Sequence, residues 1–203
     1  NITNNSNYVN SYVNKILTTS YYNATNGTSS GNCYSYYNTL TGNCDFTLTG
    51  LQADYRKMLV NATWHLGGIS AANLTIDTIY TQERGTTVYG SNPTTTTAYV
   101  GLMYPSDFGY SVLAAVCPRT TLANSYASVC GSYSWLNGPG YEWTINPSSA
   151  DANKIFMIMY GGNLGYSSSV VYGFAVRPAI YLDASVYVLD GEGSYDDPYI
   201  ISI

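Results

Sequence analysis

Charged residues are scarce in this sequence of 203 residues, where Asp, Glu, Lys and Arg together make up 9%. A soluble domain typically carries about 25%. Only seven residues are Lys or Arg, they form no cluster, and the formal net charge is −5. Neutralising phosphates and binding anionic lipid both require clustered basic residues. We therefore expect no nucleic-acid partner and no attraction to an anionic membrane surface.

Long apolar runs are also missing. No run approaches the ~20 residues that a helix needs to span a bilayer, so we expect no direct membrane insertion. The chain begins with Asn1 rather than Met, which is consistent with removal of a signal peptide or anchor upstream. We expect residues 1–47 to form an N-terminal helix and a disulfide-closed loop at the end of a trimmed anchor, and residues 48–203 to form the main domain.

Cysteine and histidine are few, which restricts metal and nucleophile chemistry. The four cysteines fall into two local pairs, Cys33 with Cys44 and Cys117 with Cys130. Neither pair has the spacing of a zinc site, and a single histidine cannot complete one. We predict two local disulfides, which imply an oxidising compartment and an extracellular or cell-surface location. The alternative is four buried free thiols in a cytosolic protein.

Uncharged polar and aromatic residues take the place of the missing charges. The chain contains 23 tyrosines, and 45% of its residues are hydrophobic. Disordered chains are poor in aromatic residues and rich in charge. The composition therefore predicts a folded domain with a surface rich in hydroxyl and amide groups.

Three segments have helical patterns. Residues 4–17 have apolar residues at helical spacing, and a weaker pattern covers residues 74–80. The strongest pattern begins with a Thr49–Gln52 capping box and ends at a Gly67–Gly68 stop. Its apolar stripe consists of Leu51, Tyr55, Met58, Leu59, Ala62 and Leu66.

From residue 100 onward the pattern changes to short strands and turns. The predicted strands are residues 100–103, 156–159, 176–182, 186–189 and 199–203. Residues 190–193 are predicted to form the hairpin turn between the last two strands. Early helices followed by antiparallel strands indicate an α+β domain.

Catalytic patterns are weak. A Ser-His-Asp triad would need His65, which is placed inside the strongest predicted helix, where a structural role is favoured. The acidic candidates for glycoside hydrolysis are scattered: Glu83, Asp107, Glu142 and Asp151. A second acidic group lies in a turn-rich segment and consists of Asp190, Glu192, Asp196 and Asp197. Such a group is compatible with a calcium-binding loop or with a solvated turn, and we favour the turn. We therefore expect no enzyme activity, no metal and no cofactor.

The segment from Trp143 to Tyr181 combines small polar residues with interspersed tyrosines. Such mixtures are typical of antibody-like binding surfaces, because Tyr offers a large rigid contact area and Ser, Gly and Asn adapt their hydrogen bonds. An ordinary polar loop over a sheet is the alternative.

Several blocks of the sequence resemble a family of C-type-lectin-like surface proteins of uncultivated bacteria and archaea. They are Ala62–Gly68, Glu83–Tyr89, Gly101–Asp107, Trp143–Pro147, Gly173–Leu182 and Tyr187–Tyr199. The resemblance covers the chain from about Asp45 onward. It implies that residues 48–203 form a lectin-like, α+β ligand-binding domain.

Within that family, the polar run is similar to the variable region of diversity-generating retroelement proteins, particularly the archaeal kind. The resemblance implies a diversifiable binding site on a stable scaffold. The implied contact residues are Ser149, Asp151, Asn153, Met157, Met159, Tyr160, Asn163, Tyr166, Ser167, Ser168, Val170 and Tyr172. The implied scaffold residues are Trp143, Pro147, Phe156, Arg177 and Pro178.

Two differences from the family argue against calcium-dependent sugar binding and against formylglycine generation. The Glu-Pro-Asn, Gln-Pro-Asp and Trp-Asn-Asp motifs of calcium-dependent sugar binding are absent. Formylglycine-generating relatives need reactive cysteines, and Cys117 and Cys130 are predicted to be paired. We therefore expect a non-catalytic protein that binds a protein or glycan ligand on another cell or virus surface. The rivals are a pilin-like or surface-filament subunit, suggested by the low charge and N-terminal helix, and a glycan-processing enzyme, suggested by aromatic and acidic residues between Trp135 and Asp151.

Overall fold

A computed structural model describes residues 6–27, 32–34, 40–138, 140–166, 172–194 and 196–203. The helical elements are η1 (Tyr8–Asn10), α1 (Tyr12–Ile16), η2 (Leu17–Tyr21), α2 (Ala53–Arg56), α3 (Ile76–Glu83), α4 (Pro105–Tyr110), η5 (Ala123–Ser125), α5 (Tyr126–Val129) and η6 (Gly131–Tyr133). The strands are β1 (Asn32–Tyr34), β2 (Leu40–Asn43), β3 (Ala62–His65), β4 (Thr95–Ala98), β5 (Val100–Leu102), β6 (Glu142–Pro147), β7 (Ile155–Ile158), β8 (Leu164–Tyr166), β9 (Pro178–Ile180), β10 (Tyr187–Asp190) and β11 (Ile200–Ser202).

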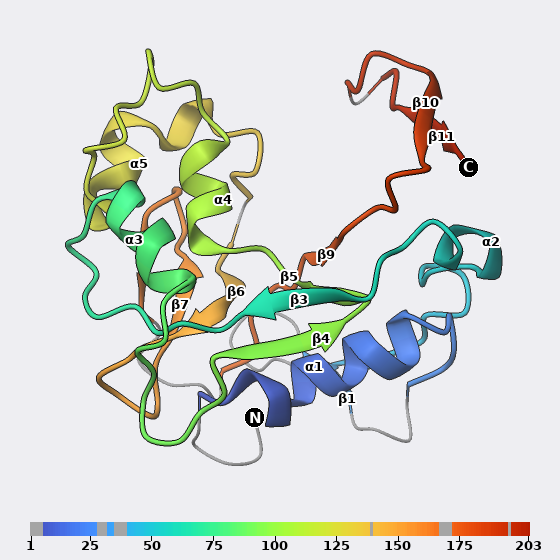
Figure 1. Cartoon of the computed structure of the whole chain (residues 1–203), viewed down its shortest axis with the longest axis horizontal. Coiled ribbons are helices and arrows are strands. Elements are labelled where there is room, and N and C mark those ends of the chain that lie inside the picture. The colour runs from blue at the N-terminus through green and yellow to red at the C-terminus, as the bar shows by residue number, and fades with distance from the viewer. Residues whose placement is uncertain (1–5, 28–31, 35–39, 139, 167–171, 195) are drawn as a thin grey trace.

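All named strands pair antiparallel, which makes this a mixed α+β chain, as the sequence predicted. The sheet β6–β7–β8 has three strands, and the pairs β1–β2, β3–β4, β5–β9 and β10–β11 have two each. Figure 1 shows α3, α4 and α5 gathered at one end of the molecule and α2 at the other, with β3 and β4 running between them.

Two clusters of buried side chains form the core. The first lies among α3, α4, α5 and β7 and includes Ile76, Phe108 and Tyr126. The second surrounds Trp64, which is buried and donates its indole Nε1–H to the Ala98 carbonyl at 2.9 Å. Tyr8 of η1 and Leu17 of η2 are buried in this second cluster. The N-terminal helical segment therefore packs on the same core as β3, β4 and β5, below β4 in Figure 1.

The prediction that a helix starts at Thr49 is wrong. Only Ala53–Arg56 is helical, and Ala62–His65 is a strand that pairs with β4 in the register Trp64↔Thr96. Gln52 does not complete a capping box, because its side-chain amide donates to the carbonyls of Thr47 and Gly50. The partner strand β4 consists mostly of threonines, which favour strands. Pairing with this distant strand therefore overrides the local helical spacing.

Other predicted elements are confirmed with shifted ends. Helix α3 begins two residues later than expected, after a Thr75 cap whose hydroxyl accepts from the backbone N of Thr78. Strands β5, β7, β9, β10 and β11 fall inside or beside their predicted ranges. Within the described residues, no helix is long and apolar enough to cross a membrane.

One of the two predicted disulfides is confirmed. Cys117 and Cys130 are bonded, with Cα atoms 5.3 Å apart, and both are buried in the first cluster. The side chain of Cys33 lies outside the described part of the chain, although its backbone in β1 pairs with Gly42 of β2. No described cysteine is free.

Candidate functional site

The sheet β6–β7–β8 places the predicted contact residues at two opposite ends. Strand β6 pairs with β7 from Pro147↔Ile155 at one end to Glu142↔Ile158 at the other. The connection at residues 148–154 therefore lies at the first end, and the turn at residues 159–163 lies at the second. Contact residues that look continuous in the sequence are separated by the length of β7, about 10–13 Å at the usual rise per residue.

At the first end, the polar side chain of Asp151 bonds to other residues of the connection at residues 148–154. The Asp151 carboxylate accepts from the backbone N of Asn153 at 2.9 Å and forms an ion pair with Lys154 at 3.2 Å. These interactions, led by the backbone hydrogen bond, lower the pKa of Asp151. Ser149 is anchored by its backbone N, which donates to the Ile69 carbonyl at 3.0 Å. Asn153 is exposed.

Residues around the second end differ in exposure. Tyr160 is 69% exposed, and Tyr172 is also exposed. Asn163 is held in place because its Oδ1 accepts from the backbone N of Ala127 at 2.6 Å. Tyr166 pairs with Phe156 and therefore lies toward the first end, where its hydroxyl donates to the Ile69 carbonyl and its ring packs edge-on against Phe156.

Both methionines of β7 and the following turn lie against the second core cluster. Met157 is only 5% exposed, so its prediction as a contact residue is corrected: its side chain points into the core. Met159 is half-buried against the same cluster. The remaining predicted contact residues, Ser167, Ser168 and Val170, lie outside the described residues.

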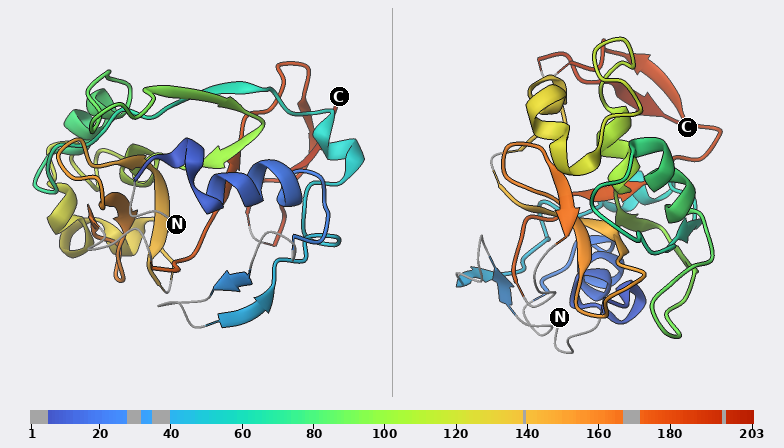
Figure 2. Two further views of the ribbon diagram at one scale, coloured as in Figure 1. Left: turned by 90° about the horizontal axis from the view of Figure 1, so that it is seen from below. Right: turned by 90° about the vertical axis from the view of Figure 1, so that its left-hand side faces the viewer.

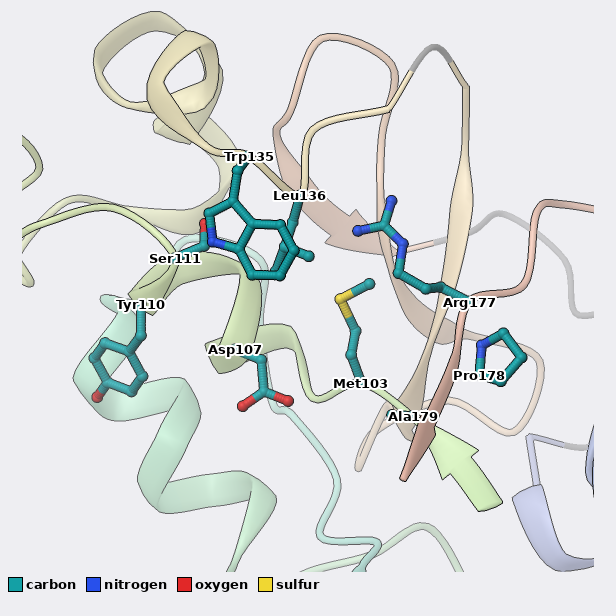
Figure 3. A pocket seen from close by; sticks show the side chains of 9 residues that line it. All are labelled: Met103, Asp107, Tyr110, Ser111, Trp135, Leu136, Arg177, Pro178 and Ala179. Carbon is teal, nitrogen blue, oxygen red and sulfur yellow. The ribbon is translucent and has the colours of Figure 1, made fainter. Parts of the chain in front are cut away.

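A cleft of about 500 Å³ opens near the Glu142 end of the sheet, between α4, the loop after η6 and the start of β9 (Figure 3). Its lining residues are Met103, Asp107, Tyr110, Ser111, Trp135, Leu136, Arg177, Pro178 and Ala179. In Figure 3, Asp107 and Arg177 lie on either side of Met103, with Trp135 and Leu136 above. Trp135 is 79% exposed, the most exposed aromatic side chain among the described residues. The cleft thus combines an apolar floor, an exposed indole and two charged groups.

The loop that carries Trp135 is fixed by several contacts. It follows the disulfide-bonded Cys130 directly. A methyl group added at Gly131 would lie 2.8 Å from the Gly161 carbonyl oxygen, so the loop packs closely on the turn that carries Tyr160. The Ser134 hydroxyl shares a hydrogen bond of 2.6 Å with Ser111, the residue that ends α4. The disulfide, the loop and the β7–β8 turn therefore hold Trp135 and Tyr160 on adjoining segments.

The guanidinium group at the cleft is held by a buried carboxylate. Arg177 Nη2 donates to Glu142 Oε2 at 3.0 Å, while the other oxygen of Glu142 is buried without a hydrogen-bond partner in the described structure. Burial raises the pKa of Glu142, and the charge of Arg177 opposes that shift. Arg177 has further N–H groups without a described partner, and they are free to donate to a ligand in the cleft.

The remaining polar groups of the cleft are mostly engaged. The Tyr110 hydroxyl donates to Asp77 at 2.8 Å, and burial together with this contact raises the pKa of Tyr110 to about 12. Asp107 accepts from the backbone N of Tyr104 at 2.9 Å through one oxygen, and its other oxygen is available. Surrounding protein raises the pKa of Asp107, although the side chain itself is exposed to solvent.

The groups considered for catalysis are not assembled. His65 lies on β3 rather than on a helix, and its backbone N donates to the Tyr104 hydroxyl at 2.8 Å. Glu83 is fully buried and bonded to Ser106. No His, Lys or Cys lines the cleft. Across the described chain, no group of three or more His, Cys, Asp or Glu side chains could hold a metal ion.

The chain matches no family model, no curated protein and no solved structure. The site is therefore argued from its own geometry. Sequence reasoning treated Arg177 and Pro178 as scaffold, yet both line the cleft. The sequence analysis considered Trp135 only as part of the glycan-processing alternative. A tryptophan in the turn-rich segment Ser134–Gly140, shortly after a disulfide cysteine, was the available signal for an exposed aromatic contact.

Proposed function

We propose that this protein is a non-catalytic ligand-binding protein whose contact surface is the cleft at the Glu142 end of the β6–β8 sheet. The exposure of Trp135 on the loop that follows the disulfide-bonded Cys130 is the observation that carries the proposal. Large aromatic side chains are enriched where ligands and partners bind, because they bury much area at little cost in side-chain entropy. The fixed loop adds to this effect, since a preorganised contact loses less freedom on binding.

The binding mode follows from the groups present. A planar or apolar part of the ligand stacks on Trp135 and contacts the floor formed by Met103 and Leu136. Arg177 donates hydrogen bonds to acceptors of the ligand, and the available oxygen of Asp107 accepts from its donors. Tyr160, on the adjoining turn, extends the contact surface outward. A protein or glycan ligand on another cell or virus surface has these features.

The scaffold is proposed to be C-type-lectin-like and extracellular or cell-surface, with residues 48–203 as the binding domain. The family resemblance, the antiparallel α+β architecture and the Cys117–Cys130 disulfide support this part of the proposal. The exposed tyrosines Tyr160 and Tyr172 support a diversifiable face of the retroelement type.

A binding screen with Trp135→Ala tests the cleft. The chain is applied to arrays of glycans and of surface proteins, and each hit is measured again with the variant. We expect at least a tenfold loss of affinity, about 1.4 kcal/mol, with unchanged thermal unfolding because the indole is exposed. Tyr55→Ala is the matched control, since Tyr55 is an exposed aromatic on α2 at the far end of Figure 1. Equal losses in the two variants would contradict the proposal.

The retroelement part has its own test. Sequencing the genomic neighbourhood should find a reverse transcriptase and a near-copy of the codons for residues 143–177, differing mainly at adenines. Absence of both would remove the diversification proposal and leave the cleft as a fixed binding site.

A further inference from the structure

The hairpin formed by β10 and β11 exposes apolar side chains to an unusual extent. Tyr187, Val188, Leu189, Tyr199, Ile200 and Ile203 are each between 53% and 58% exposed. The two strands pair only with each other in the described structure, so each has an outer edge without a strand partner. Figure 1 and the left view of Figure 2 show the hairpin at the same end of the molecule as α2, apart from α3, α4, α5 and the larger sheet. Contiguous exposed apolar side chains on an unpaired edge are typical of surfaces that bind a partner.

The hairpin is nevertheless well defined by its backbone. The backbone N of Asp183 donates to the Met58 carbonyl at 2.8 Å, and that of Val60 donates to the Tyr181 carbonyl at 2.9 Å. At its tip, the backbone N atoms of Glu192, Gly193 and Ser194 all donate to the Asp197 carbonyl. A two-stranded hairpin that buries little is marginally stable alone. These contacts instead hold the segment that leads into β10 and the tip of the hairpin.

The charge of this segment is of one sign. Residues 183–203 contain five acidic residues and no Lys or Arg: Asp183, Asp190, Glu192, Asp196 and Asp197. None of them forms an ion pair with a described residue. The formal net charge of the chain is −5, so acidic and basic residues balance in the remainder.

A second copy of the chain also has a formal net charge of −5, so it brings more acidic than basic groups to this acidic segment. Six of the seven basic side chains are already engaged within the chain: Arg56, Lys57, Arg84, Arg119, Lys154 and Arg177. Only Lys15 has no described side-chain partner. Two hairpins would also repel each other, because like charges across an interface are destabilising. Charge complementarity therefore favours a different protein.

We propose that the β10–β11 hairpin binds an extended segment of a basic partner protein, in which Lys or Arg alternates with apolar residues. The partner segment adds as a strand to an outer edge of the hairpin, so that its backbone completes the hydrogen bonds there. Its apolar side chains cover the exposed apolar residue of the edge that it joins, Val188 on β10 or Ile200 on β11, and its basic side chains face the acidic residues. This surface is distinct from the Trp135 cleft.

A defined peptide serves as the probe. A short peptide of alternating Lys and Val is titrated into the intact chain, beside a Glu/Val peptide of the same length. We expect binding of the Lys/Val peptide only, weakened about tenfold or more when salt rises from roughly 0.05 to 0.5 M, because salt screens exposed charges. Asp190→Asn with Glu192→Gln and Asp196→Asn should weaken it at least tenfold while keeping the hydrogen-bond acceptors.

The apolar contribution is tested separately with Val188→Thr and Ile200→Thr, which keep β-branched side chains in the strands. The substitution on the edge that the peptide joins should weaken peptide binding, whereas Trp135→Ala should leave it unchanged. The proposal is overturned if neither peptide binds, or if both bind equally. It is also overturned if sedimentation shows concentration-dependent dimers that Ile200→Thr abolishes, because the hairpin then binds a second copy.

Discussion

Glu83 is bonded twice to Ser106 across the interface between α3 and α4. One carboxylate oxygen accepts from the backbone N of Ser106 at 2.7 Å, and the other accepts from its hydroxyl. Arg84 adds an ion pair at 2.9 Å and lies over the ring of Tyr80. Glu83 lies inside the protein without lining the cleft, so we assign it a structural role that joins two helices.

This burial makes the stability of the protein depend on pH. Burial raises the pKa of Glu83 from an ordinary value of 4.5 to about 7, although its contacts with Ser106 and Arg84 lower it. The folded protein therefore holds the proton more tightly than the unfolded chain does. The resulting stability is fully present below pH 4.5 and is lost as the pH rises through about 7.

We expect the free energy of unfolding to fall across this window by up to roughly 3 kcal/mol from Glu83 alone. Glu83→Gln should remove this component, because the amide stays neutral and can still bond to Ser106. Urea unfolding at pH 5 and pH 8 measures the difference, and Asp54→Asn, at an exposed carboxylate, is the control. An unchanged pH dependence in Glu83→Gln would contradict the assignment.

The Cys117–Cys130 disulfide should stabilise the fold and the cleft together. It closes a loop with a sequence separation of 13, and a loop of this size corresponds to about 3 kcal/mol in the chain-entropy description. Replacing both cysteines by Ala should reduce the unfolding free energy by about this amount. It should also weaken ligand binding, because the segment with Trp135 follows Cys130. If stability falls and binding in the folded state is unchanged, the disulfide does not position the cleft.

The close packing of the Trp135 loop on the β7–β8 turn gives a third prediction. Gly131→Ala places a methyl group 2.8 Å from the Gly161 carbonyl oxygen, and such overpacking typically costs about 1–3 kcal/mol. Gly138→Ala is the matched control in the same loop, since its nearest neighbour is Arg177 Nη2 at 3.8 Å. Chemical denaturation compares the two variants. Equal stability would show that the loop moves away without cost.

Much of the fold followed from local sequence, and the errors have one physical cause. The helical pattern near residues 74–80, the Cys117–Cys130 pair and the strand β7 are set by nearby residues, and all were predicted. The segment from Thr49 to Leu66 was wrong, because pairing with the threonines of β4 is a long-range interaction that a local pattern does not contain. Trp64 illustrates this: it lies within the segment predicted to be helical, but its indole hydrogen bond goes to Ala98, on the distant partner strand.

The site was predictable only in part for the same reason. The tyrosine-rich run correctly pointed to exposed Tyr160 and Tyr172. Its members were treated as one face, whereas β7 separates Asp151 from Tyr160. The cleft is formed by segments distant in sequence, such as α4 and the start of β9, which only the fold brings together. The sequence analysis therefore did not place Trp135 beside Arg177 in one cleft.

Met157 and Tyr160 were both predicted to be contact residues, but Met157 is buried in the core and Tyr160 is exposed. Met157 lies in the second core cluster, so Met157→Ala should reduce the unfolding free energy by about 2–5 kcal/mol through lost burial and a cavity. Tyr160 is exposed, so Tyr160→Ala should change stability by less than about 0.5 kcal/mol.

The binding data should show the opposite order. Tyr160→Ala should weaken the ligands found with the Trp135 screen, because Tyr160 adjoins the cleft, while folded Met157→Ala should bind them with unchanged affinity. Conservative Met157→Leu keeps the volume of the core and should restore stability without affecting binding. If Met157→Leu weakened binding in a fully folded protein, the side chain would act on the contact surface after all. The buried Met157 side chain would then affect ligand binding through β7. In that case the core and the cleft would not have the separate roles that we argued from the sheet geometry.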